Sequence, residues 1–151
     1  MSYITKSPKE TEKLGHFLLN KMSLHSQKNG LVILLSGELG AGKTLLVKGL
    51  ARLLGIKTKV KSPTFTLMKK YKIAPGSKLK SKRYLYHLDC YRLRNHKDLL
   101  VLGIKDILKN KDNVIAIEWP ERIKKILPKK HIKVQIDHVA KNQRKISINL
   151  R

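Results

Sequence analysis

The sequence predicts an α/β domain with a parallel central sheet, antiparallel marginal strands and helices on both faces of that sheet. Two apolar runs, Leu31–Ser36 and 114–117, show no polar alternation before they end, which is typical of central strands covered on both faces. The tail alternates apolar with polar residues over 132–136 and 146–150, which indicates an antiparallel hairpin with one buried face. These patterns predict a parallel core that is extended by antiparallel strands.

The first predicted helix begins at Pro8. Ser7 suits the N-cap, Pro8 the first helical position, and Glu10 the acidic end of a capping box. Apolar residues then recur at helical spacing, which predicts one buried face. A second helix is expected over 45–54, where the same spacing is followed by Gly55.

The middle of the chain predicts a hairpin followed by short helices. Pro63 favours an extended or turn geometry at the residue before it, and 64–67 suits a strand that leaves this turn. Residues 83–88 suit the returning strand of the hairpin. Because Gly103 interrupts the helical pattern over 98–108, we expect two short helices there rather than one.

The stretch 37–44, GELGAGKT, follows the first apolar run and fits the phosphate-binding pattern G-x-x-x-x-G-K-[ST]. Its glycines let backbone N–H groups turn toward phosphate oxygens, and the next helix adds its positive dipole end. Lys43 is expected to reach the β- and γ-phosphates, and the Thr44 hydroxyl to ligate Mg²⁺. The alternative is a chance glycine-rich turn, but the flanking strand and helix favour a nucleotide-binding loop. The predicted loop contacts are Glu38, Leu39, Gly40, Ala41, Gly42, Lys43 and Thr44.

Two acids and a tryptophan stand at the ends of predicted strands. Glu118 follows the run 114–117, at the edge where such sheets bind ligands, and could touch Mg²⁺, hold a metal-bound water or polarise the attacking water. The alternative is an ordinary strand-end carboxylate. Asp89 is either a site acid or a turn or helix-cap residue, and Trp119 either shapes the site or belongs to the core. His87 is expected to point to the face opposite Asp89, which argues against a His/Asp catalytic pair.

The charge of the chain is unusually positive. Lys and Arg total 34 against 10 Asp and Glu, a formal net charge of +24, and no acid occurs between Glu38 and Asp89. Such a surface attracts polyanions, and RNA is the first candidate. The alternative is a genome-wide bias toward lysine, since the chain carries no Arg-Gly tract or RNA-binding signature.

Length and composition limit the remaining possibilities. A chain of 151 residues predicts a single domain spanning 1–151. The lone Cys90 cannot form an internal disulfide, and neither cysteine nor histidine spacing suggests a structural metal site. The sequence lacks an apolar run of about 18 residues and an N-terminal apolar signal core, so we expect a cytoplasmic protein without a membrane span.

Four motifs occur together in an order that resembles the TsaE (formerly YjeE) family. They are GELGAGKT at 37–44, SPTFTL at 62–67, YHLDCYRL at 86–93 and IEWPER at 117–122. The family consists of small bacterial P-loop ATPases of the tRNA threonylcarbamoyladenosine pathway. The resemblance covers nearly the whole chain and implies a P-loop NTPase-like fold that binds ATP and Mg²⁺.

The resemblance also implies roles for single residues. Lys43, Asp89 and Glu118 would be catalytic, Thr44 and Glu118 would hold the metal, and Trp119 would belong to the nucleotide site. The segment 62–67, including Thr64, would respond to the nucleotide state. Hydrolysis would act on the TsaB–TsaD complex, would be weak without these partners, and would involve tRNA directly or through the complex.

Two departures from the family pattern stand out. Leu45 replaces the second Thr that usually follows G-K-T. Lysine is in excess over 58–83 and again at Lys124, Lys125, Lys129 and Lys130, so partner surfaces do not carry over residue by residue. Two other functions remain open. One is a small-molecule P-loop kinase, although the short connections leave little room for an acceptor pocket. The other is a basic RNA-binding module with a vestigial phosphate loop.

Overall fold

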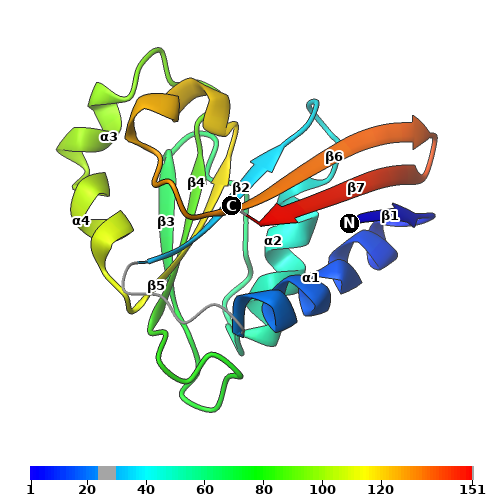
Figure 1. Ribbon diagram of the computed structural model, residues 1–151, viewed down its shortest axis with the longest axis horizontal. Coiled ribbons are helices and arrows are strands. Elements are labelled where there is room, and N and C mark those ends of the chain that lie inside the picture. The colour runs from blue at the N-terminus through cyan, green and yellow to red at the C-terminus, as the bar shows by residue number, and fades with distance from the viewer. Residues whose placement is uncertain (24–29, 151) are drawn as a thin grey trace.

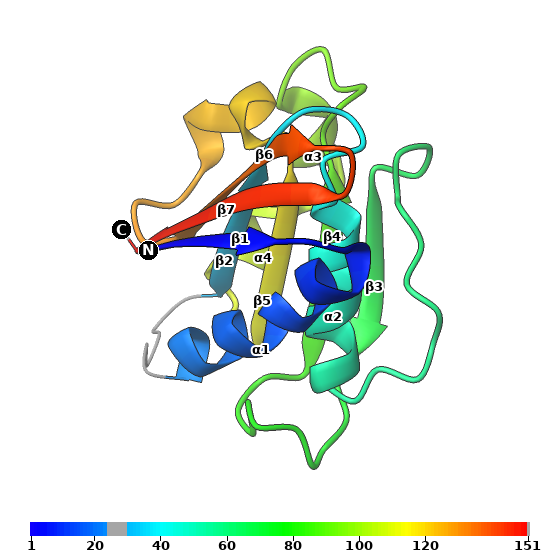
Figure 2. The same cartoon turned by 90° about the vertical axis from the view of Figure 1, so that its right-hand side faces the viewer.

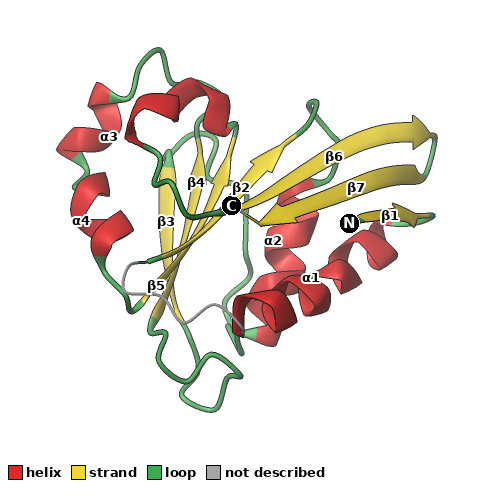
Figure 3. Ribbon diagram, viewed as in Figure 1, coloured by secondary structure: helices red, strands yellow, loops and turns green. Residues whose placement is uncertain are grey.

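The computed structural model describes residues 1–23 and 30–150, which build one seven-stranded sheet in the order β1-β7-β6-β2-β5-β4-β3 (Figures 1 and 3). Helices flank this sheet. The elements are β1 (Ser2–Thr5), α1 (Pro8–Ser23), β2 (Leu31–Ser36), α2 (Lys43–Leu53), β3 (Met68–Lys72), β4 (Tyr84–Asp89), α3 (Lys97–Val101), α4 (Ile104–Lys109), β5 (Asn113–Glu118), the 3₁₀ helix η1 (Pro120–Ile126), β6 (Ile132–Ala140) and β7 (Gln143–Leu150).

The centre of the sheet is parallel and its margins are antiparallel. Strand β2 pairs in parallel with β5 and β6, and β4 pairs in parallel with β5. Strand β3 joins β4, β7 joins β6 and β1 joins β7 in antiparallel register. This arrangement confirms the fold class that the apolar runs and the alternating tail predict. The short strand β1 is not among the predicted strands, because its four residues carry no clear periodic pattern.

Helices cover both faces of the sheet, as expected. Side chains of β2 alternate between two hydrophobic clusters: Ile33 packs in the cluster that contains α2, and Leu34 in the cluster that contains α3 and α4. Figure 2 shows α1 and α2 together on the first of these faces. No helix within residues 1–23 and 30–150 has the length and apolar character that a membrane crossing requires.

Helices α1 and α2 approach each other closely through glycine. A Cβ atom placed on Gly49 of α2 would lie 1.9 Å from the carbonyl oxygen of Glu12 in α1, so no side chain fits at this position. Gly15 of α1 faces the same crossing, where a Cβ would lie 2.7 Å from the backbone of Gly49. This close crossing holds α2, the helix that follows the phosphate loop, against α1.

Most local predictions are confirmed, and one is wrong. Helix α1 begins at Pro8, and the short helices α3 and α4 are separated by Gly103 with φ of 75°. The strand expected over 64–67 is absent, because these residues turn and Leu67 has a left-handed φ of 61° that interrupts extended backbone. Strand β3 therefore begins at Met68 and pairs with β4 as the returning strand of the predicted hairpin.

Candidate functional site

The glycine-rich loop joins β2 to α2 at the carboxyl edge of the sheet. Gly37, Gly40 and Gly42 have φ values of 144°, 77° and 109°, which residues with a Cβ rarely adopt. Gly42 is the N-cap of α2, and among residues 1–23 and 30–150 no side chain caps this helix. The N–H groups of its first turn are therefore free of a side-chain cap, as a phosphate-binding helix start requires.

Lys43 lies folded against its own loop. Its side chain is buried, and Nζ donates to the carbonyl oxygens of Gly37 at 2.7 Å and Glu38 at 2.8 Å. The same Nζ lies 4.1 Å from the ring centroid of Trp119. Burial lowers the pKa of Lys43, although the nearby carboxylate of Glu118 opposes this change. The ammonium group thus contacts two loop carbonyls and the Trp119 ring, within the electrostatic influence of the predicted acids.

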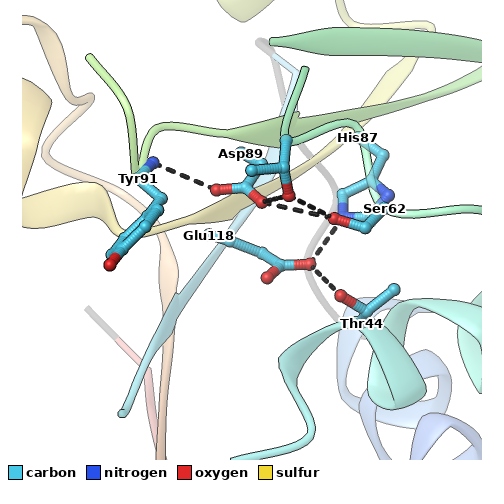
Figure 4. A network of polar contacts seen from close by, with 7 residues as sticks. Thr44, Ser62, His87, Asp89, Tyr91 and Glu118 are labelled. Atoms are coloured by element: carbon cyan, nitrogen blue, oxygen red, sulfur yellow. Dashed lines mark hydrogen bonds and ion pairs between the residues drawn. The ribbon is translucent and has the colours of Figure 1, made fainter. Parts of the chain in front are cut away.

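Thr44, His87 and Glu118 meet at one carboxylate oxygen (Figure 4). Oε1 of Glu118 accepts a hydrogen bond from the Thr44 hydroxyl at 2.8 Å and lies 2.7 Å from Nε2 of His87. Both His87 and Glu118 are buried. An ionised carboxylate can only accept, so with Glu118 ionised this contact requires the proton on Nε2.

The expectation that His87 points away from the site is wrong. His87 and Asp89 are two residues apart on β4, and alternate residues of a strand share a face. The histidine therefore faces the site, where its partner is Glu118 on the neighbouring strand rather than Asp89. Its Nδ1 is buried without a hydrogen-bond partner among the described residues.

Asp89 ends β4 directly beside Glu118 of β5 in the register of the two strands. Its Oδ2 accepts hydrogen bonds from the hydroxyls of Thr64 at 2.6 Å and Ser62 at 3.3 Å. Its Oδ1 accepts the backbone N–H of Tyr91 at 3.0 Å. The two interpretations of Asp89 thus coincide: its carboxylate organises a turn and also lies at the predicted site (Figure 4).

One cavity of about 440 Å³ brings most of the predicted residues together. The Asp89 and Glu118 carboxylates and the Thr44 hydroxyl come from two strands and the start of α2. Two predicted contacts lie elsewhere: Ala41 is fully buried, and the exposed Glu38 lines a neighbouring cavity. The predicted residues around the smaller cavity are Leu39, Gly40, Gly42, Lys43, Thr44, Asp89, Glu118 and Trp119.

The β6–β7 hairpin contributes contacts that sequence reasoning missed. Arg144 of β7 is buried, and its Nε donates to the carbonyl oxygen of Ala41 at 2.8 Å. Nε2 of His138 lies 3.3 Å from the carbonyl oxygen of Gly40. The hairpin therefore contacts two backbone carbonyls of the phosphate loop. A signal for Arg144 did exist, since it shares the inward face of β7 with buried isoleucines.

A second cavity, of about 1020 Å³, adjoins the first and shares Leu39 and Trp119 with it. It lies between η1 and β6, and Lys124, Lys129 and Lys133 line it. The short connections of the chain predict little room for an acceptor pocket, and the cavity beside the loop is larger than this prediction allows.

The donor set at the smaller cavity fits a phosphate-bound Mg²⁺. Thr44 and Glu118 offer the hard oxygen ligands that Mg²⁺ prefers, and this ion is commonly held by one or two carboxylates together with substrate phosphates. The left-handed glycines and the start of α2 without a side-chain cap offer the phosphates their backbone donors. The residues present therefore suit a nucleoside triphosphate with its metal.

Comparisons with known proteins agree with the resemblance seen in the motifs. The family described as "Threonylcarbamoyl adenosine biosynthesis protein TsaE" matches residues 5–146. A Haemophilus influenzae protein described as "tRNA threonylcarbamoyladenosine biosynthesis protein TsaE" is 40% identical over 117 residues, covering 78% of this chain and 68% of the relative. A Treponema pallidum protein of the same description is 32% identical over 148 residues, 98% and 99% of the two chains. The crystal structure of Bacillus subtilis YdiB superposes with a TM-score of 0.67 at 29% identity and covers 98% of this chain and 83% of that one.

Proposed function

This chain belongs to the TsaE family of tRNA threonylcarbamoyladenosine biosynthesis, and on that premise we propose that it is a Mg²⁺-dependent ATPase. In this proposal, ATP hydrolysis supports the modification of tRNA by acting on a complex of the TsaB and TsaD proteins. The observation that carries the proposal is the shared cavity of the phosphate loop, the Thr44 hydroxyl and the carboxylates of Asp89 and Glu118.

The loop and α2 bind the triphosphate in this mechanism. The backbone N–H groups that follow Gly42 would donate to phosphate oxygens, and Lys43, now bonded to two loop carbonyls, would contribute its positive charge to the β- and γ-phosphates. Mg²⁺, held by Thr44 and Glu118, would neutralise the charge that develops on the transferring phosphoryl group. The ring of Trp119, beside Lys43, closes one side of the site.

The two acids have different surroundings, which suggests different tasks. Glu118 is fixed by the Thr44 hydroxyl and the His87 ring, so it would serve as a metal ligand or polarise the attacking water. Asp89 holds the hydroxyls of Ser62 and Thr64, so it ties the 62–67 segment to the site. A change at the phosphate would then reach this segment through Asp89, as a nucleotide-responsive switch requires.

ATPase assays with the partner proteins test this function. We expect hydrolysis to be weak for the chain alone and to rise when the TsaB–TsaD pair and tRNA are added. Lys43→Ala and Asp89→Ala should each abolish the stimulated rate, whereas Lys105→Ala, a change at an exposed position on α4, should not alter it. The proposal fails if the partners give no stimulation or if the two site variants remain as active as the parent.

The larger cavity favours a second candidate, a small-molecule kinase. Its volume of about 1020 Å³ beside the loop would accommodate a phosphoryl acceptor, and its lysines would attract an anionic one. Following the terminal phosphate of labelled ATP distinguishes the two functions. Inorganic phosphate as the product supports the ATPase, and a phosphorylated small molecule would support the kinase.

A further inference from the structure

A basic groove lies beside the candidate nucleotide cavity, along α2 and the segment that follows it. Lys48, Arg52, Lys57 and Lys59 line this groove, which encloses about 300 Å³. Lys48 also lines the cavity that holds the phosphate loop and the two acids. The groove and the candidate nucleotide site therefore share a wall.

Two lysines of the groove, Lys57 and Lys59, lie on a segment whose backbone is held in place at both ends. Ile56 and Val60 are buried in the hydrophobic core, and the backbone N–H of Ile56 donates to the carbonyl oxygen of Ala51 in α2. Between these anchors, Lys57 and Lys59 are exposed. Because the backbone is already held, less entropy is lost when a ligand orders these side chains.

The positive charge of the groove is largely uncompensated. The lining of the groove holds four basic residues and no Asp or Glu. Arg52 pairs with Glu12 at 2.8 Å, but across residues 1–23 and 30–150 no ion pair is found for Lys57 or Lys59. A concave surface lined by one sign of charge attracts a polyanion.

We propose that this groove binds the phosphate backbone of RNA. The choice of RNA among polyanions rests on the family's place in a tRNA pathway, and it does not require ATP hydrolysis by this chain. The RNA contact and the ATPase can therefore fail separately. Since Lys48 borders both spaces, RNA held in the groove lies next to the candidate nucleotide site.

A pair of charge-reversal variants tests the proposal. Lys57→Glu/Lys59→Glu alters the groove, and Lys141→Glu/Lys145→Glu makes the same change in net charge at the end of the β6–β7 hairpin, which projects from the body of the domain (Figure 1). Binding of a fluorescent, unmodified tRNA transcript is measured by anisotropy between 50 and 200 mM salt. We expect the groove variant to bind at least about tenfold more weakly, with a salt slope reduced by ~1 to 2, and the hairpin variant to stay within about threefold of the parent.

Three results would overturn the proposal: a parent affinity that does not change with salt, equal losses in both variants, or equal binding to duplex DNA or to anionic phosphatidylserine vesicles. Thermal unfolding of each variant verifies that it is folded. Basal ATP hydrolysis should be unchanged in the groove variant, while Lys43→Ala should lose hydrolysis and keep its RNA affinity. This reciprocal pair separates failure of the RNA contact from failure of the ATPase.

Discussion

Replacing Glu118 by glutamine separates the chemistry of the site from its stability. The amide oxygen of glutamine still accepts hydrogen bonds from the Thr44 hydroxyl and His87 Nε2, which the carboxylate accepts at 2.8 and 2.7 Å. A hydrogen bond to a charged acceptor contributes about 1.5–3 kcal/mol and one to a neutral acceptor about 0.5–1.5, so the two bonds together weaken by ~2–3 kcal/mol. The substitution also removes a buried charge and, with it, a desolvation cost of several kcal/mol. This gain opposes the loss from the weaker hydrogen bonds. We therefore expect the free energy of unfolding to change by no more than ~2 kcal/mol.

The effect on ATP hydrolysis should be much larger. Glutamine can neither neutralise a metal ion nor accept a proton from water, and a positioned base typically contributes about 10²–10⁴-fold to a rate. At ~1.36 kcal/mol per tenfold, the barrier should rise by ~2.7–5.4 kcal/mol. Glu121→Gln is the matched control, because Glu121 is exposed, lies three residues away and loses the same charge.

Single-turnover release of phosphate, measured with the TsaB–TsaD pair and tRNA present, gives the rate, and urea unfolding gives the stability. Fluorescence of Trp119, the single tryptophan of the chain, reports ATP binding beside Lys43. The role of Glu118 is refuted if its glutamine variant hydrolyses ATP within about threefold of the parent rate. It is equally refuted if the Glu121 control loses as much activity.

Three further substitutions probe the supports of the site. Arg144→Met keeps the aliphatic stem but leaves the buried carbonyl of Ala41 without its donor, so urea unfolding should show a loss of ~1–3 kcal/mol together with weaker ATP binding. Gly49→Ala places a Cβ atom 1.9 Å from a carbonyl oxygen of α1 and should cost about 3 kcal/mol, whereas Gly76→Ala, whose Cβ meets nothing within 4 Å, should be nearly neutral in the same assay. Burial raises the pKa of the Cys90 thiol from 9.0 to about 12, so above pH 9.0 the unfolded chain releases this proton first and the free energy of unfolding falls; the Cys90→Ala variant should show a smaller fall between pH 8 and 10.

The part of the site that sequence reasoning predicts depends on local patterns and on strand direction. An apolar run followed by GELGAGKT identifies the loop, and apolar runs ending in an acid identify Asp89 and Glu118. Parallel strands bring their carboxyl ends to one edge of a sheet, and the register indeed sets these two acids side by side. The roles proposed for them follow from this placement and stay predictions until activity is measured.

The features that sequence reasoning missed depend on tertiary contacts or on which face of a strand a residue occupies. Arg144 reaches the Ala41 carbonyl from 103 residues away, and no local pattern names that partner. Residues 64–67 have the composition of a strand, yet the backbone turns at Leu67. The N–H of Asp89 donates to the carbonyl oxygen of Leu67 at this turn. The placement of His87 was predictable, because residues two apart on a strand share a face.

The hydrogen bonds already present at the site determine what ATP binding can gain. Lys43 Nζ uses two of its three N–H donors on loop carbonyls and gives up these bonds when it turns toward a phosphate, whereas the Thr44 hydroxyl donates its proton to Glu118 and keeps its oxygen lone pairs for a metal. Such an exchange yields only the difference between two hydrogen bonds, which is a small part of the ~4–6 kcal/mol that each is worth in isolation. The exchange at Lys43 therefore adds little net free energy to ATP binding. A partner that stabilises the exchanged arrangement would add its own binding free energy, which gives a physical reason to expect hydrolysis to depend on partners.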